Sequence, residues 1–262
     1  MLVVDALGRQ LDIQEPPRRI VSLVPSLTEL LFDLGRAPIA ASDYCLYPAR
    51  ELENLPRVGG QKDPDLEKLL SLRPDFVVVA KEENLRRDVE KLERAGVNVF
   101  VTDVKNIEDA LRLPFQLGAA LGVARASSQA LHDGMAAGVE VARRVAPKPP
   151  LRGVCFVWRD PWIAAGGDTY LSDVMGACGV VNLLGDRSRY PKLDLEAAQN
   201  LRPDLILLPS EPYPFSERDL PSVANGLLVD GTVLCWYGAR TGRIAELATI
   251  MAACATSMHS PR

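Results

Sequence analysis

The residues best suited to catalysis or metal binding are few in this sequence. It contains two histidines, His132 and His259, and no Cys-x-x-Cys pair. A catalytic triad or a zinc or manganese centre needs several converging imidazole, thiolate or carboxylate groups. Phosphate-binding and nucleophile-elbow motifs are also missing from the sequence. We therefore expect no catalytic residue, no metal site and no bound cofactor, and a surface position for His132. Abundant Asp and Glu keep an enzyme open as an alternative.

The five cysteines, Cys45, Cys155, Cys178, Cys235 and Cys254, are scattered and odd in number. This pattern favours reduced thiols that are partly buried. A Cys178–Cys254 disulfide is the alternative, and it would indicate export from the cytosol.

All three tryptophans follow runs that are typical of β-strands: Trp158 and Trp162 after one run, Trp236 after another. Ligands of open α/β proteins bind beyond the carboxyl ends of parallel strands. The tryptophans are therefore candidates for a ligand-binding edge, although a tryptophan at a strand end also serves often as a core residue. Arg240 and Arg243 either meet a polar ligand edge or are solvated charges at a helix start.

An internal repeat divides the chain. Residues 65–80 and 194–209 share Asp-Leu-Glu and Leu-Arg-Pro-Asp, each followed by an apolar run. Such a run is typical of a strand buried on both faces, as in a parallel sheet. The repeat predicts two similar α/β lobes.

The N-terminal half supports this architecture. Strands are expected at residues 19–24, 39–42, 76–80 and 97–102, with helices at 26–35 and 84–95. Ser26 and Glu29 have capping-box spacing, and Gly35 is a typical residue after a helix end. Alternating strands and helices predict an open parallel sheet.

A long Ala-rich segment lies between the two halves. Residues 123–146 predict a helix of roughly 36 Å that Gly134 and Gly138 weaken, and Pro147–Pro150 end it. We expect an N-terminal lobe over 1–122, a linking backbone helix over 123–149 and a C-terminal lobe over 150–262.

Charge and hydropathy exclude several classes of protein. The net charge of −4 gives no basic footprint for nucleic acid, and no apolar run is long enough to span a bilayer. The segment from Met1 to Asp5 has no features of a signal peptide. If Met1 is the native start, the protein is expected in the cytoplasm; otherwise a signal has been removed.

Three segments carry a resemblance to a known family: residues 18–29 (Arg-Arg-Ile-Val-Ser-Leu-Val-Pro-Ser-Leu-Thr-Glu), residues 42–48 (Ser-Asp-Tyr-Cys-Leu-Tyr-Pro) and the two Leu-Arg-Pro-Asp motifs. In order and spacing they resemble the cobalamin-binding proteins of bacterial ABC importers. More broadly, they resemble the helical-backbone metal receptors (class III substrate-binding proteins), which include siderophore- and haem-binding proteins. The resemblance runs from about Asp5 to the C-terminal helix. It implies two Rossmann-like α/β lobes with parallel sheets, joined by one long helix, with a ligand cleft between them.

The resemblance also implies ligand-binding residues, because aromatic side chains suit a large flat ring. They are Tyr44, Trp158, Trp162, Tyr190, Trp236, Tyr237 and Arg240. The chain departs from the cobalamin receptors at Gly59-Gly60-Gln61 and at Ala80-Lys81, where they carry tryptophans. The wall of the ligand cleft in the N-terminal lobe should therefore be more polar. Another tetrapyrrole, a metal chelate or a smaller ligand remains an alternative.

Glu67 and Glu196 are equivalent positions of the repeat. In the family, one surface glutamate from each lobe docks onto a dimeric permease. The alternative is that acidic residues simply favour a helix N-terminus.

These observations predict a binding protein that captures a corrinoid or related metal chelate for ABC-type import. A cytosolic paralogue that stores or hands off a chelate or tetrapyrrole is the first alternative, and an enzyme that uses the same cleft is the second.

Overall fold

The computed structural model describes residues 2–259, so Met1 and residues 260–262 of the predicted lobes lie outside the described residues. The chain forms two compact units. The first takes in residues up to 103 together with 111–133, and the second takes in 104–110 together with residues from 134 onward. Each unit has its own sheet, which confirms the two-lobed α/β class. The lobe boundaries at 122 and 150 stay a prediction.

The sheet of the first unit has the order β4-β3-β5-β6, and every pairing in it is parallel. Its central strand is the predicted run Phe76–Ala80, in which all five side chains are buried. The strands are β3 (Ile20–Ser22), β4 (Ala40–Ala41), β5 (Phe76–Ala80) and β6 (Asn98–Thr102), and a two-stranded ribbon, β1 (Leu2–Val4) and β2 (Gln10–Asp12), precedes them.

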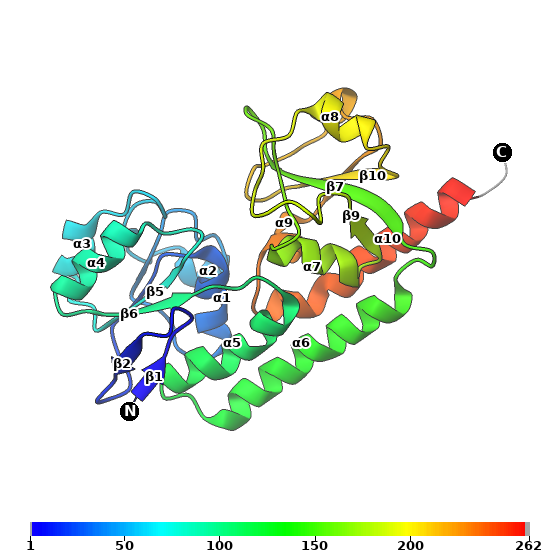
Figure 1. The fold of residues 1–262 in the computed structure, drawn as a ribbon. Coiled ribbons are helices and arrows are strands. Elements are labelled where there is room, and N and C mark those ends of the chain that lie inside the picture. Colours follow the sequence, from blue (N-terminus) through cyan, green and yellow to red (C-terminus); the bar gives the residue numbers. More distant parts are fainter. Residues whose placement is uncertain (1, 260–262) are drawn as a thin grey trace. The chain divides into compact units, whose positions relative to one another are not determined.

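Helices cover both faces of this sheet. Figure 1 shows α3 and α4 on one side and α1 on the other. Val77 and Val79 of β5 pack in one apolar cluster with Leu69 and Leu92 of the covering helices. The helices are α1 (Pro25–Asp33), α2 (Ala49–Leu52), α3 (Leu66–Ser71), α4 (Arg86–Arg94) and α5 (Ile107–Ala120).

The capping box expected at Ser26 and Glu29 is wrong. Helix α1 begins at Pro25, and Val24 at its N-cap makes no side-chain capping bond. Proline suits the first helical position because a backbone N–H at that position has no hydrogen-bond partner within the helix. The helix end is as predicted, because Gly35 has a φ of 68°.

The second unit has a sheet of order β11-β10-β7-β8, with β9 also paired to β7. Strand β10 is the second apolar run of the repeat and is fully buried, as β5 is. Only β8 runs antiparallel to its neighbour, so this sheet is mixed. Its strands are β7 (Leu151–Trp158), β8 (Ile163–Ala164), β9 (Val180–Asn182), β10 (Leu205–Pro209) and β11 (Gly226–Val229). Its helical segments are α7 (Tyr170–Ala177), α8 (Leu195–Asn200), η1 (Leu220–Ser222), α9 (Gly231–Cys235), η2 (Ala239–Arg243) and α10 (Ile244–His259).

The repeated Leu-Arg-Pro-Asp motif has the same structural role in both units. Its aspartate binds the backbone N–H at the start of the neighbouring strand: Asp75 accepts from Arg19 at 2.9 Å, and Asp204 accepts from Arg152 at 2.7 Å. The same two arginines return a side-chain bond to the carbonyl that ends the preceding helix, at Leu72 and Leu201. The repeat therefore reflects one duplicated joint between helix and strand.

The arginine of each motif also has the same backbone conformation. Arg73 and Arg202 have φ values of 47° and 53°, in the left-handed region that a non-glycine residue rarely adopts. This conformation lets the chain turn from the helix, which ends at Ser71 or Asn200, into the buried strand that begins at Phe76 or Leu205.

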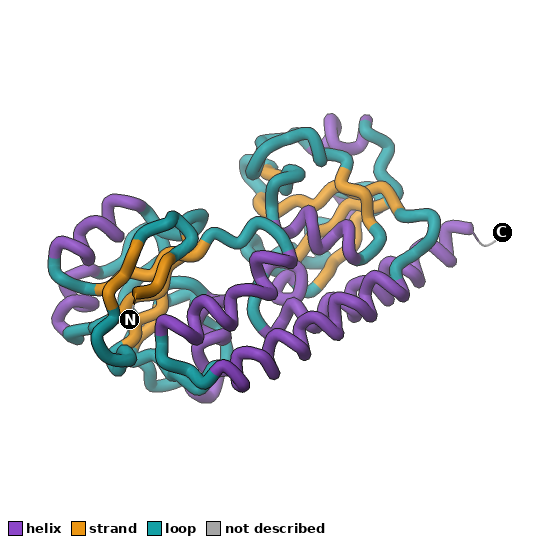
Figure 2. Tube along the Cα trace, turned by 60° about the horizontal axis from the view of Figure 1, so that its bottom comes forward, coloured by secondary structure: helices purple, strands orange, loops and turns teal. Residues whose placement is uncertain are grey.

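A single helix, α6 (Arg125–Val145), follows α5, and Figure 2 shows it as one unbroken helix. Its two glycines differ in their surroundings. A Cβ added at Gly138 would lie 1.8 Å from the backbone oxygen of Gly242, whereas a Cβ at Gly134 would meet nothing within 4 Å. Gly138 is therefore needed for the close approach of the η2 backbone to α6. No helix within residues 2–259 has the length and apolar character that a bilayer span requires.

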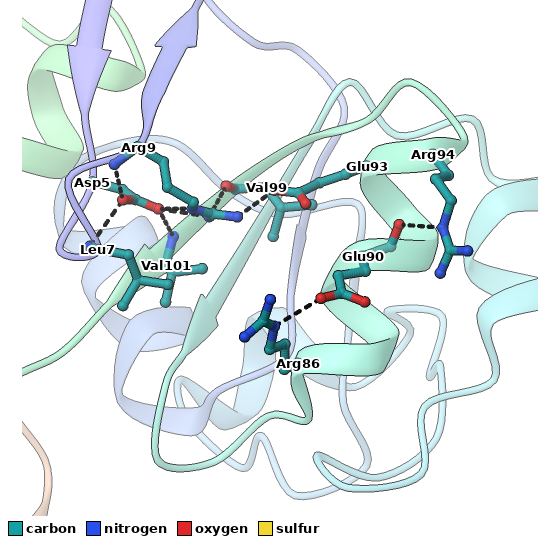
Figure 3. Close-up of polar contacts among 9 residues, drawn as sticks. All are labelled: Asp5, Leu7, Arg9, Arg86, Glu90, Glu93, Arg94, Val99 and Val101. Carbon is teal, nitrogen blue, oxygen red and sulfur yellow. Dashed lines mark hydrogen bonds and ion pairs between the residues drawn. The ribbon is translucent and has the colours of Figure 1, made fainter.

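The N-terminal ribbon is joined to the first sheet by a buried carboxylate (Figure 3). The side chain of Asp5 accepts bonds from the backbone N–H groups of Leu7 and Arg9 and from that of Val101 on β6. It also pairs with the Arg9 guanidinium at 2.6 Å, which in turn donates to the carbonyl of Val99 at 2.9 Å. The oxygens of Asp5 accept all these bonds.

We expect Asp5→Asn to lower the free energy of unfolding by about 2–4 kcal/mol, because an amide presents N–H groups to donors inside a buried site. Urea denaturation followed by circular dichroism measures this. The Arg86–Glu90 pair on α4, also drawn in Figure 3, is the control: Arg86 is 92% exposed, so Arg86→Ala should leave the midpoint almost unchanged. Equal midpoints for Asp5→Asn and the parent would contradict this account.

The two glycines of α6 give a second matched pair. Gly134→Ala should raise the free energy of unfolding by up to about 1 kcal/mol, because alanine favours a helix and the site is open. Gly138→Ala should lower it by about 1–3 kcal/mol, because the new methyl group displaces the η2 backbone. Thermal melts of both variants test this, and stabilisation by both would show that η2 does not require the close approach.

Candidate functional site

An aromatic cluster lies at the carboxyl ends of β7 and β10. The Trp158 ring packs edge-on against Tyr213 at 5.5 Å between centroids, and Tyr213 contacts Phe215 at 4.6 Å. Trp162 stacks on Phe215 at 5.8 Å and touches Phe156 of β7 at 4.7 Å. These rings come from two neighbouring strand ends, where an open α/β sheet binds its ligand.

The two predicted tryptophans of this cluster differ in exposure. Trp158 is 44% exposed, whereas Trp162 is partly buried against the core of the second unit. This packing favours the core alternative for Trp162 and leaves Trp158 as the aromatic face that solvent reaches. The ligand-binding role of either residue stays a prediction.

Tyr213 and Phe215 did not emerge from the sequence as candidates. The signal for them is their position: Glu211-Pro-Tyr-Pro-Phe215 follows the end of β10 as Trp158 ends β7. The rule that selected the tryptophans therefore applies equally to these two residues.

An ion pair holds the loop that carries Trp158 and Trp162. The Arg159 guanidinium pairs with Asp219 and lies 5.6 Å from the centre of the Trp162 ring. Burial alone would raise the pKa of Asp219, but the N–H of Ser216 and the Arg159 guanidinium outweigh it and hold this pKa below its ordinary value. Asp219 therefore stays ionised and keeps the loop in place.

Trp236, Tyr237 and Arg240 form a separate and buried group. Their exposed fractions are 7%, 9% and 9%. The Arg240 guanidinium lies 5.3 Å from the Trp236 ring centre and donates to the Thr232 hydroxyl at 2.6 Å. Tyr237 meets the ring of Tyr170 edge-on at 5.9 Å. The interpretation of Arg240 as a solvated charge is wrong, because stacking and hydrogen bonding hold its side chain inside the unit.

Arg243 lies on the surface, as expected of a solvated charge. It is paired at 2.9 Å with Glu246, three residues along the chain. Tyr190 is half-buried in the loop before α8, with the Arg189 guanidinium 6.0 Å from its ring centre.

In the first unit, Tyr44 lies in the loop that follows β4 and is 61% exposed. Two hydrogen bonds to Cys45 hold this loop in place. The Thr28 hydroxyl donates to the sulfur at 3.0 Å, and Arg57 donates to the carbonyl at 2.7 Å. Burial raises the pKa of the Cys45 thiol, so this residue packs rather than reacts. Two further apolar side chains of the same loop, Leu46 and Tyr47, are 51% and 40% exposed.

The polar wall expected around residues 59–61 and 80–81 is present beside Tyr44. A Cβ on Gly60 would lie 3.3 Å from the Tyr44 ring. The Gln61 amide donates to the Glu83 carboxylate just beyond the end of β5. Burial, followed by the charge of Glu82, raises the pKa of Glu83 to about 7. This edge of the unit therefore carries an acid that titrates near neutral pH.

Glu67 and Glu196 lie in the first turns of α3 and α8, and both are exposed. They belong to neither aromatic group. Both leucines of the repeated Asp-Leu-Glu, Leu66 and Leu195, pack onto the cores of their units.

The remaining chemistry-bearing residues have structural contacts. His132 is half-buried, with Nδ1 2.9 Å from the carbonyl oxygen of Leu111 and its ring 5.2 Å from Phe115. It therefore joins α6 to α5, and its side chain is only partly exposed where a surface position was expected. Among residues 2–259, no three His, Cys, Asp or Glu side chains gather as metal ligands do.

The Cys178–Cys254 disulfide is wrong, because none of the five cysteines forms a disulfide. The Cys178 thiol donates to the carbonyl of Ile244 at the start of α10, at 3.4 Å. Cys254 lies ten residues further along the same helix, about 15 Å away along its axis. A disulfide requires Cα atoms within about 7 Å.

A cavity of about 10 Å³ lies inside the second unit, lined by apolar side chains that include Met175, Leu207 and Met251. This volume suits at most one water molecule. This cavity therefore offers no room for a ligand, and the strand-end loops remain the candidate site.

Comparisons with known proteins agree with this architecture. The vitamin B12-binding protein of Vibrio cholerae is 27% identical over 194 residues, which cover 73% of this chain and 70% of that protein. The vitamin B12-binding protein of Salmonella paratyphi A is 29% identical over 194 residues, 72% of this chain and 71% of that protein.

Solved structures share the fold. The periplasmic heme-binding protein RhuT from Roseiflexus sp. RS-1 superposes with a TM-score of 0.79 at 22% identity, over 91% of this chain and 99% of that one. The periplasmic vitamin B12-binding protein BtuF of Vibrio cholerae superposes with a TM-score of 0.77 at 22% identity, over 92% and 98%. The family described as periplasmic binding protein matches residues 20–218. The chain therefore belongs to the periplasmic binding protein family.

Proposed function

We propose that this protein is the substrate-binding component of an ABC importer and that it captures a corrinoid or a related metal chelate without chemical change. The family binds small ligands and works with ABC permeases. Relatives at 27% and 29% identity are named for vitamin B12 binding. The observation that carries the proposal is the pair of exposed aromatic side chains at strand ends, Trp158 in one unit and Tyr44 in the other.

A large aromatic ring in water is unfavourable unless something covers it. Trp158 keeps 44% of its surface exposed although Tyr213 supports one edge of its ring. Burying the rest against a flat ligand would remove apolar area from water at low entropic cost. A tetrapyrrole or other planar chelate has the size and shape to do so.

The proposal that the protein is not an enzyme rests on the state of its nucleophiles. Burial raises the pKa of Cys155 and of Cys178 to about 12, so neither forms a thiolate at neutral pH. The Nδ1 atom of His132 lies at a backbone carbonyl. Relatives named in the comparisons are binding proteins.

We propose further that Glu67 and Glu196 dock the protein onto the permease. Other identical residues of the repeat have intramolecular roles: Leu66 and Leu195 pack onto the cores, and Asp75 and Asp204 form the joint between helix and strand. The two glutamates are exposed at equivalent positions. Matched carboxylates on two units suit a partner with two-fold symmetry, because charge complementarity sets orientation and association rate.

One observation favours the cytosolic alternative, a paralogue that stores or hands off a chelate or tetrapyrrole. None of the five cysteines forms a disulfide, which is typical of a reducing compartment. The family itself is typically periplasmic. The two functions share the ligand site and differ in whether a permease recognises the protein.

Trp158→Ala should raise the dissociation constant of the ligand at least about tenfold, because a central aromatic contact is lost. Cobalamin, haem and ferric siderophores form the test panel, with binding read from a spectral or melting shift. Trp158→Phe should restore most of the affinity because it keeps an aromatic face. Val181→Ala, a change at an equally exposed apolar residue of β9, should have no effect. Absence of binding to every chelate, or equal affinity for Trp158→Ala and the parent, would overturn the proposal.

The double variant Glu67→Lys/Glu196→Lys should leave ligand affinity intact and reduce docking about tenfold, because both carboxylates are reversed in charge. The measurement is stimulation of ATP hydrolysis by a vitamin B12 ABC importer in liposomes. Glu53→Lys/Glu217→Lys, also one exposed glutamate in each unit, is the charge-matched control. Equal stimulation by both double variants would exclude the docking role, and no stimulation by the parent would favour the cytosolic alternative.

A further inference from the structure

The carboxyl-end edge of the first sheet carries a connected set of ionisable side chains. Lys81, Glu82 and Glu83 follow β5, and Asp103 follows β6. The Gly59–Lys62 loop lies against them and against Tyr44, whose ring would be 3.3 Å from a Cβ on Gly60. The exposed aromatic ring and the ionisable groups are therefore parts of one surface.

Hydrogen bonds hold this set in place. Asn84 is buried, and its amide donates to the carbonyl of Gln61 at 3.0 Å while its oxygen accepts from the N–H of Ala80 at 2.9 Å. The side chain of Gln61 donates to Glu83, and Lys62 donates to the carbonyl of Glu82 at 2.6 Å. The loop and the end of β5 are thus joined through side chains and backbone, and the Glu83 carboxyl has a defined position beside the Tyr44 loop.

The charge on this edge is predominantly negative. Carboxyl groups outnumber ammonium groups there, and one of the ammonium groups, on Lys81, is paired with Asp103 at 2.9 Å. The carboxyl groups are on Asp43, Asp63, Glu82, Glu83 and Asp103, and the ammonium groups are on Lys62 and Lys81.

Two kinds of metal chelate differ at the rim of the ring. One kind carries neutral carboxamides, which have N–H groups to donate, and the other carries carboxylates, which have only acceptors at neutral pH. Carboxyl and amide oxygens on the protein can accept from the first kind. The second kind would bring like charges together, which costs free energy in a partly desolvated site.

Resting on the function proposed above, we propose that the edge formed by Gln61, Lys62, Glu82 and Glu83 selects a metal chelate whose rim carries neutral amides over one whose rim carries carboxylates. Glu83 is the specificity-determining residue of this edge, because Gln61 holds its carboxyl beside the aromatic loop.

Ionisation of Glu83 makes this selection depend on pH. Burial and the neighbouring Glu82 raise the pKa of Glu83 to about 7, while Lys62 and the Gln61 amide act in the opposite direction. Asp43, Asp63, Lys81 and Asp103 are the other charged groups on the edge. A raised pKa means that Glu83 is mainly neutral at pH 6 and mainly ionised at pH 8. Rejection of a carboxylate-bearing chelate should therefore be stronger at pH 8.

The test uses two corrinoids with the same ring and metal. Cobyric acid carries amides at all but one of its acidic side chains, and cobyrinic acid carries free carboxylates at all of them. Dissociation constants are measured by quenching of tryptophan fluorescence at pH 6 and pH 8. We expect the parent protein to prefer cobyric acid, and this preference to grow about threefold to tenfold from pH 6 to pH 8.

Glu83→Gln should remove the growth of the preference with pH, because the variant keeps a hydrogen-bonding side chain without a titrating group. Glu90→Gln makes the same change on the exposed face of α4 and should behave as the parent does. This comparison shows whether the pH dependence of the preference comes from Glu83, from another carboxyl group or from Lys62.

The outcomes distinguish this proposal from the function on which it rests. Equal binding of both corrinoids, or a preference for cobyrinic acid, overturns the selection and leaves the binding function standing. Binding of haem, a carboxylate-bearing chelate, without binding of cobyric acid also overturns the selection and leaves the binding function standing. Absence of binding to any chelate overturns both. A preference whose pH dependence persists in Glu83→Gln overturns the role of Glu83.

Discussion

Burial of the central strands on both faces is the constraint on which the rest of this structure depends. Every side chain of β5 and of β10 is buried, so neither strand can present a polar group without a large desolvation cost. Chemistry is thereby confined to the residues that follow the strands. The aromatic cluster beyond β7 and β10 and the ionisable edge beyond β5 and β6 both lie where this constraint permits them.

Much of the frame could be predicted because it depends on local patterns. The two apolar runs of the repeat predict β5 and β10, and Gly35 predicts the end of α1. The predicted capping box was wrong because Pro25 starts that helix one residue earlier. The capping-box spacing and the proline are both local signals, and they compete for the helix start. Gly138 appeared only as a weak helix former, since the reason for it is the backbone of Gly242, distant in sequence. Local patterns thus predict elements, whereas close approaches between elements need the folded chain.

The candidate site could be predicted less well than the frame. Position after a strand selected Trp158, Trp162 and Trp236 together, yet only Trp158 is substantially exposed. The difference comes from partners remote in sequence: Phe215 covers Trp162, and Arg240 lies over Trp236. Sequence position gives the edge of the sheet on which a side chain lies, but it does not say whether another loop covers it. Tyr213 and Phe215 show the converse, because they also follow a strand and contact the rings of the tryptophans.

The duplicated frame and the strand-end loops are held by different bonds, and this separation explains how two similar units came to carry different chemistry. Asp75 and Asp204 bind the beginnings of the neighbouring strands, whereas Glu83 and Trp158 lie at strand carboxyl ends. A change at one end of a strand therefore leaves the joint at the other end intact. The first unit carries an acidic, hydrogen-bonded edge and the second an aromatic one. The aromatic edge favours a flat apolar face on a molecule that contacts it, whereas the acidic edge disfavours negative charge on such a molecule.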